Sequence, residues 1–217
     1  MAIAAGTQAH RELTRKPTAA ELSAAAAAAV AGRWRTWPAG RIFPAGLGYS
    51  TDLLTQETAR RIGVSPGTAC VAAVDRALDR LAARAGCRAA LRATYLDQLQ
   101  GVVYTVGVLA FADRPRAAAF VRGLPRNPPR VIGLRAQAFP GTGAAAFDDA
   151  ARQVATARQD GPYVVLTVAG YADGRPAAVT AKPRTSVFAP AAQLAAAIIG
   201  PLTVPAEVSC RGPEWSC

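Results

Sequence analysis

The pattern of hydrophobic and polar positions changes along this chain of 217 residues. The N-terminal part has helical features, since Thr18 and Glu21 form a capping box at the start of an alanine-rich segment that extends to Gly32. A second, short helix is predicted over 51–62, because glycine and proline follow it and would end it. From residue 88 onward, hydrophobic residues alternate with the period of a β-strand.

The alternating part of the sequence predicts an antiparallel sheet. Strands over 89–97 and 102–112 form a hairpin, and the second of them is hydrophobic on both faces, as expected for a central strand. Further strands are expected over 131–139 and 163–172. The segment 152–158 fits either the other arm of a hairpin with 163–172 or part of a helix.

Helices separate and follow these strands. Pro115 lies in the first turn of a helix that extends to about Gly123, and a last helix covers 189–199, where Gly200-Pro201 would break it. These elements predict an α+β fold: a single, mainly antiparallel sheet of about 4–5 strands with helices packed on one face, stapled by disulfides. The expected organisation is a disordered tail over 1–17, a helix and connector over 18–50, and one domain over 51–217.

The chain contains four cysteines, Cys70, Cys87, Cys210 and Cys217. A single helix over 71–85 would hold the first two sulfurs more than about 20 Å apart, whereas a disulfide needs Cα atoms within about 7 Å. If Asp75 instead caps the helix and Gly86 follows its end, residues 70–74 can return alongside it and the two cysteines meet. We prefer this arrangement. We expect the last two cysteines to close the C-terminal tail; the alternative is two free thiols.

Two of the three tryptophans lie in the segment 33–41, beside several arginines. Indole and guanidinium groups both favour the headgroup layer of a membrane, so this segment contains candidate contacts with a membrane interface. They are Trp34, Arg35, Trp37 and Arg41. The alternative is that the aromatic side chains lie across the core. No run of about 20 apolar residues is present, and the N-terminus lacks the layout of a signal peptide.

The basic charge is large and consists almost entirely of arginine. The net charge is +11, and Lys16 and Lys182 are the only lysines. Such a charge indicates an anionic partner, either nucleic acid, phospholipid headgroups or a wall polymer. Nucleic acid is disfavoured because the arginines occur singly, with no compact basic run and no aromatic RNA-binding signature. The spaced arginines include Arg76, Arg80, Arg84, Arg88 and Arg92.

Residues suited to catalysis are few. His10 is the only histidine and lies in the N-terminal tail, which disfavours a Ser-His or Cys-His nucleophile and a histidine metal site. The adjacent Asp148 and Asp149 fit a helix N-terminus better than a catalytic pair, and Asp97 fits a turn. The segment 141–147 resembles a phosphate loop but has no lysine. We therefore expect no catalytic residue, no cofactor and no metal.

Four runs of sequence carry a resemblance to a known group. They are TARRIGVSPGTAC, GCRAALRATYLDQLQGVVYTVGVLAFAD, LRAQAFPG and GPYVVLTVAGYADGRP. Over about 33–217, the chain resembles uncharacterised actinobacterial proteins anchored in the cell envelope. Its layout is similar to the disulfide-bearing extracytoplasmic sensor domains of mycobacterial receptor kinases and to related lipoproteins. The resemblance implies an α+β domain held by disulfides without catalytic residues, although this chain shows neither an anchor helix nor a lipobox cysteine.

These observations favour a non-enzymatic, extracytoplasmic or membrane-associated module that binds an envelope component or a partner protein. The first alternative is a cytosolic small-molecule-binding protein or unusual enzyme with reduced cysteines. The second is a basic protein associated with nucleic acid. The sequence does not identify the ligand.

Overall fold

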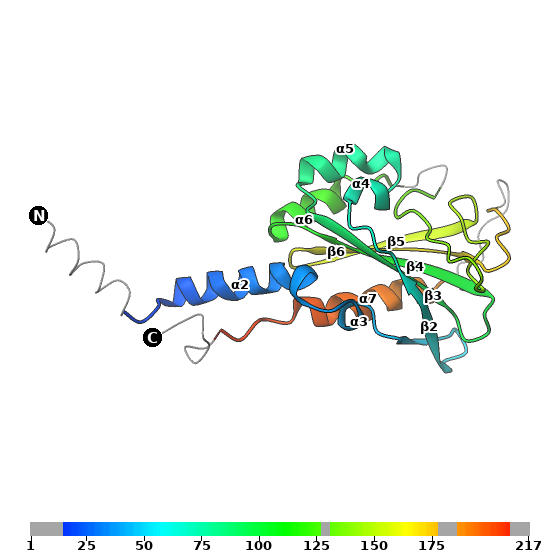
Figure 1. Ribbon diagram of the computed structural model, residues 1–217, viewed down its shortest axis with the longest axis horizontal. Helices are drawn as coiled ribbons and strands as arrows, with labels where there is room; N and C mark the ends of the chain where they lie inside the picture. The colour runs from blue at the N-terminus through cyan, green and yellow to red at the C-terminus, as the bar shows by residue number, and fades with distance from the viewer. Residues whose placement is uncertain (1–14, 127–130, 178–185, 209–217) are drawn as a thin grey trace, which may run out of the picture.

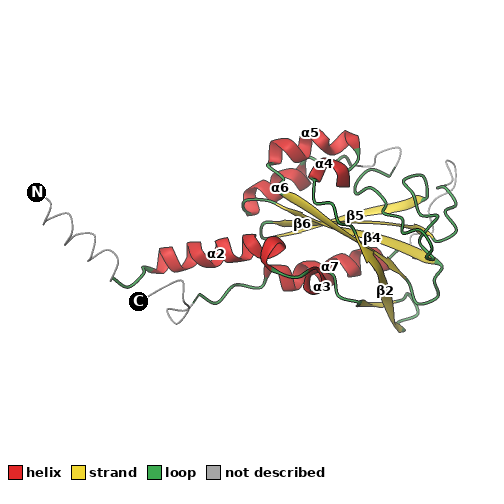
Figure 2. Cartoon of the chain, viewed as in Figure 1, coloured by secondary structure: helices red, strands yellow, loops and turns green. Residues whose placement is uncertain are grey.

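The computed structural model describes residues 15–126, 131–177 and 186–208. They form one antiparallel sheet of six strands, in the order β1-β2-β3-β4-β6-β5, with helices on both faces (Figures 1 and 2). The strands are β1 (Gly46–Ser50), β2 (Gln56–Val64), β3 (Ala89–Leu96), β4 (Val102–Ala110), β5 (Arg152–Asp160) and β6 (Tyr163–Tyr171). The helices are α2 (Ala19–Thr36), α3 (Ala39–Ile42), α4 (Cys70–Ala73), α5 (Arg76–Ala85), α6 (Arg114–Arg122) and α7 (Pro190–Thr203).

The two central strands are buried almost throughout because helices cover both of their faces. Every residue of β4 is buried, and only the last residue of β6 is not. β4 pairs along its whole length with β3 on one side and with β6 on the other. The predicted hairpin and the central position of its second strand are therefore confirmed.

The two faces of the sheet carry separate hydrophobic cores. On one face, which we call the α5 face, α4, α5, α6 and the segment 131–151 pack against the sheet. On the other, the α7 face, α7 and α3 pack together with the C-terminal end of α2. The prediction that helices cover one face is wrong. A strand such as β4, apolar on both sides, requires a cover on each of them.

The sheet also has six strands instead of the expected number of about 4–5. The additional strands are β1, from the segment predicted as a connector, and β2, which lies where a helix over 51–62 was predicted. The residues of β2 include glutamine, glutamate, alanine and arginine, which favour helices. Pairing with β1 and β3 outweighs this local preference, as is common for strands.

The predicted strand over 131–139 is not a strand. Its only ladder contact within the described residues is an isolated bridge between Val74 and Leu134. The segment crosses the α5 face instead of extending an edge, and Leu134 is fully buried. It can approach the sheet this closely because Gly107 lies beneath it, where a Cβ atom would overlap the Leu134 side chain.

Three further predictions concern the segment 152–158, the start of α2 and the end of α7. The segment 152–158 is part of β5, which forms a hairpin with β6, so the strand alternative is correct. The capping box of Thr18 and Glu21 is present at the start of α2. α7 continues through Pro201 to Thr203, beyond the predicted end, although a proline at this position removes a backbone hydrogen bond of the helix. Leu202, in the added turn, is buried with 1% of its surface exposed.

Candidate functional site

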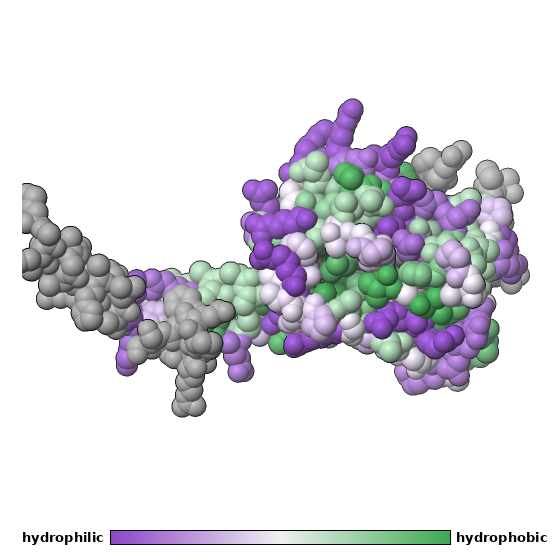
Figure 3. Space-filling view, in the orientation of Figure 1, coloured by the Kyte–Doolittle hydropathy of each residue, from purple (hydrophilic) through white to green (hydrophobic). Residues whose placement is uncertain are grey.

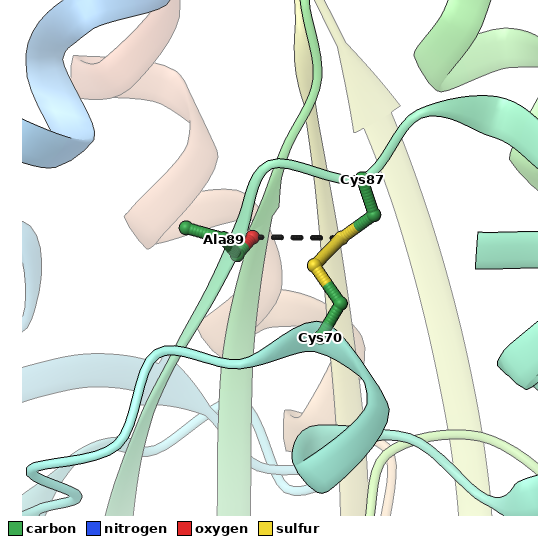
Figure 4. The surroundings of a disulfide bond; sticks show 3 residues. All are labelled: Cys70, Cys87 and Ala89. Carbon is green, nitrogen blue, oxygen red and sulfur yellow. Dashed lines mark hydrogen bonds between the residues drawn. A yellow bond between two sulfur atoms is a disulfide. The ribbon is translucent and has the colours of Figure 1, made fainter. Parts of the chain in front are cut away.

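A disulfide joins Cys70 and Cys87, as predicted, with Cα atoms 6.4 Å apart (Figure 4). α4 places Cys70 beside the end of α5, where Gly86 takes up the left-handed conformation that ends the helix. The carbonyl oxygen of Ala89 lies 3.6 Å from Cys87 Sγ. The bridge therefore ties the short helix α4 to the point where α5 leads into β3. The second expected pair, Cys210 and Cys217, lies outside the described residues.

Asp75 precedes α5 as expected, but its side chain does not cap the helix. The carboxylate accepts two hydrogen bonds from Arg152, at 2.9 and 3.0 Å, and a third from the backbone N–H of Gly133 at 2.8 Å. Arg152 is 7% exposed and also donates to the carbonyl oxygen of Leu134 at 2.7 Å. This buried ion pair joins α5, β5 and the segment 131–151. Nothing in the sequence signals this ion pair, because Asp75 and Arg152 are 77 residues apart.

Arg33 is the buried member of the arginine–tryptophan cluster, which we define as Arg33, Trp34, Arg35, Trp37 and Arg41. Its guanidinium donates to the carbonyl oxygens of Pro201, Leu202 and Val204, at 3.3, 3.0 and 2.5 Å. These carbonyls lie at the C-terminal end of α7, where the helix dipole favours a cation. The pKa of Arg33 is lowered, and burial of the guanidinium is the largest cause. Arg33 thus fixes α2 to α7.

The backbone of α2 is also held by a tyrosine from the sheet. The hydroxyl of Tyr163 donates to the carbonyl oxygen of Val30 at 2.7 Å and accepts from the N–H of Trp34 at 3.3 Å. Tyr163 is fully buried, and burial raises its pKa. The C-terminal third of α2 is therefore part of the folded domain, whereas its N-terminal part extends away from it (Figure 1).

The two tryptophans of the cluster are half-buried against the α7-face core, and the arginines stack on them. The guanidinium carbons of Arg41 and Arg33 lie 3.7 and 4.9 Å from the centroid of the Trp37 ring, and that of Arg35 lies 5.5 Å from Trp34. Arg35 and Arg41 are exposed. The aromatic rings contribute to the core, as the alternative predicted, while the guanidinium groups of Arg35 and Arg41 face solvent. Contact of this cluster with a membrane interface stays a prediction.

The carboxylates considered for catalysis each have structural partners. Asp148 accepts from the N–H groups of Ala150 and Ala151, and Asp149 pairs with Arg135 at 3.1 Å. Asp97 accepts from the N–H of Val102 at 2.9 Å across the β3–β4 turn, in agreement with the predicted turn role. These three side chains are not brought together around a cavity. Within the described ranges, no group of three or more histidine, cysteine, aspartate or glutamate residues could hold a metal ion.

A polar group lies at the end of the sheet near the β3–β4 turn. Tyr49 donates to Glu57 at 2.5 Å, and the buried Tyr104 lies in the same core. An open depression of about 490 Å³ adjoins this turn and is lined by Ala45, Gly46, Thr58, Arg60, Asp97, Gln98 and Gln100. It is open to solvent and therefore lacks the enclosure typical of a small-molecule site.

Comparison with protein-family models, with curated proteins and with solved structures finds no match to this chain. Among the residues that the structure covers, no helix combines the length and apolar character needed to cross a bilayer.

Proposed function

We propose that this protein is a disulfide-stabilised, non-catalytic binding or sensory module that works outside the cytoplasm, at the cell envelope. The Cys70–Cys87 bridge carries the proposal, because such bonds form and persist in oxidising compartments and are rare in the cytosol. The bridge is compatible with an extracytoplasmic location and joins two elements of the domain core.

The placement of the charged side chains supports a binding role. The carboxylates that the sequence offered for catalysis are hydrogen-bonded within turns or paired with arginine. By contrast, Arg35 and Arg41 are exposed beside the point where α2 extends from the domain. A tethered or peripheral module with this cluster could meet a membrane interface through Arg35 and Arg41, with Trp34 and Trp37 behind them.

The experiment is a thiol count on protein taken from its native cells. Cells are quenched in acid, free thiols are alkylated before any reductant is added, and peptides are analysed by mass spectrometry. We expect a linked peptide pair containing Cys70 and Cys87, and the same two cysteines alkylated only in a sample reduced beforehand. Free Cys70 and Cys87 in the unreduced sample would overturn the proposal and favour a cytosolic protein with reduced cysteines.

A further inference from the structure

The arginines that occur singly in the sequence come together on one surface in the structure. α5 buries Leu78, Ala82 and Ala85 against the sheet. Arg76, Arg80 and Arg84 recur every four residues on its opposite side, and all three are exposed. At about 1.5 Å per residue, their Cα atoms cover about 12 Å of the helix axis.

α6 extends this basic surface. It lies beside α5, with Gly123 next to Leu81 and Arg116 next to Gly86, so the two helices run in opposite directions. Arg116 and Arg122 are exposed on it. Figure 3 shows hydrophilic side chains projecting from the end of the molecule that α5 and α6 occupy. We call this surface the arginine face, consisting of Arg76, Arg80, Arg84, Arg116 and Arg122.

The positive charge of the arginine face is barely compensated. Its only ion pair within the described ranges is a 3.8 Å contact between Arg116 and Asp113. Asp79 is the only acidic residue within α5 and α6, and it lies to the side of the arginine row, half-buried. Like charges held at this spacing repel one another. A compensating anion from outside the chain would relieve that repulsion.

The surface is also held rigidly. The Cys70–Cys87 bridge fixes the C-terminal end of α5, and the buried pair of Asp75 with Arg152 fixes its N-terminal end. An array of cations fixed in advance loses less entropy on binding than one on a mobile segment.

We propose that the arginine face is a docking surface for the anionic phospholipid headgroups of a membrane. The residues exposed between the arginines are small, such as Ala77 and Ala83, and offer no aromatic ring on which a base could stack. The large apolar residues of α5 face the core, so the contact is electrostatic and does not insert into the bilayer. The inference rests on the proposed envelope location for its biological setting.

The test is co-sedimentation of the full chain with vesicles of phosphatidylcholine alone or mixed with phosphatidylglycerol. We expect binding only to the mixed vesicles, and its loss when salt is raised from about 0.05 to about 0.5 M. The triple variant R76Q/R80Q/R84Q should bind at least about tenfold more weakly, since each basic residue near an anionic surface contributes to affinity. The control R60Q/R158Q/R175Q removes the same charge from exposed positions elsewhere and should bind like the unmodified chain.

Two further measurements, one on a variant of the arginine–tryptophan cluster and one with DNA, test other binding surfaces and another partner. Equal weakening by both triple variants would show that net charge alone drives binding, and would overturn the assignment to this face. The variant R35Q/R41Q should weaken binding less than R76Q/R80Q/R84Q does; a larger loss in R35Q/R41Q would transfer the main contact to the arginine–tryptophan cluster. Tighter binding to a DNA duplex than to the mixed vesicles at the same salt would identify nucleic acid as the partner. None of these results depends on the thiol count, so the two proposals can fail separately.

Discussion

The two faces of the sheet are stabilised in different ways. The α7 face is covered mainly by one helix of 14 residues that buries Leu194, Ile198 and Ile199, together with large aromatic side chains from the sheet. The α5 face is covered by helices of 4, 10 and 9 residues whose buried positions include many alanines. Alanine buries little apolar area. The α5 face adds a disulfide and a buried ion pair, which indicates that short, alanine-rich helices need such links to stay in place.

The largest effect is expected from Arg152→Ala on the α5 face. Removal of one partner from a buried ion pair leaves the other without compensation and typically costs about 4 kcal/mol. Urea unfolding measures the change in the free energy of unfolding. Arg158→Ala, an exposed residue on the same strand, is the control and should change it by less than about 0.5 kcal/mol. Equal effects of the two variants would show that the ion pair does not stabilise this face.

At alkaline pH, the free energy of unfolding should fall because of buried tyrosines in the core of the α7 face. Burial raises the pKa of Tyr95 and Tyr104 above the ordinary value of 10.0. The fold favours the neutral hydroxyls, so their contribution is complete below pH 10 and is lost as the pH rises above it. At about 1.4 kcal/mol per pH unit for each tyrosine, Tyr95 and Tyr104 together account for a loss of about 3 kcal/mol at about pH 11.

Urea unfolding at a series of pH values checks this prediction. Tyr104→Phe keeps the ring and removes the titrating group, so its free energy of unfolding should fall less steeply above pH 10. An identical slope in the variant and the unmodified chain would contradict the assignment to Tyr104.

Loss of the disulfide should be the second-largest effect on the α5 face. The bridge closes a loop with a sequence separation of 17, for which chain entropy predicts about 3 kcal/mol. The paired variant C70A/C87A should lose this amount in urea unfolding. Reductant should lower the stability of the unmodified chain by about 3 kcal/mol more than that of the variant, which keeps Cys210 and Cys217. A variant as sensitive to reductant as the unmodified chain would contradict the prediction.

The smallest effect is expected where α2 meets the α7 face. Tyr163→Phe removes a hydroxyl that bonds to the backbone at Val30 and Trp34, at a cost of about 1 kcal/mol. Hydrogen exchange should accelerate at the C-terminal end of α2 more than in β4. Tyr171→Phe, whose hydroxyl lies on a half-buried residue, serves as a comparison. Uniform acceleration throughout the chain would indicate a global loss of stability instead.

The sequence by itself determined the local features of this protein. Alternation identified the hairpin of β3 and β4, the capping box located the start of α2, and helix geometry together with Asp75 and Gly86 predicted that Cys70 and Cys87 meet. These features depend on neighbours within about one or two turns of chain, or on the fixed rise of a helix, and are therefore readable from residue order.

Only the tertiary structure decided the rest. β2 has a helix-favouring composition and becomes a strand because β1 and β3 pair with it. The carboxylate of Asp75 does not cap α5 but pairs with Arg152, 77 residues away. A charge-assisted hydrogen bond from a buried arginine is stronger than one from a backbone N–H. Arginines that the sequence presents singly form one surface when α5 and α6 pack side by side, because packing, not sequence spacing, determines which side chains share a face.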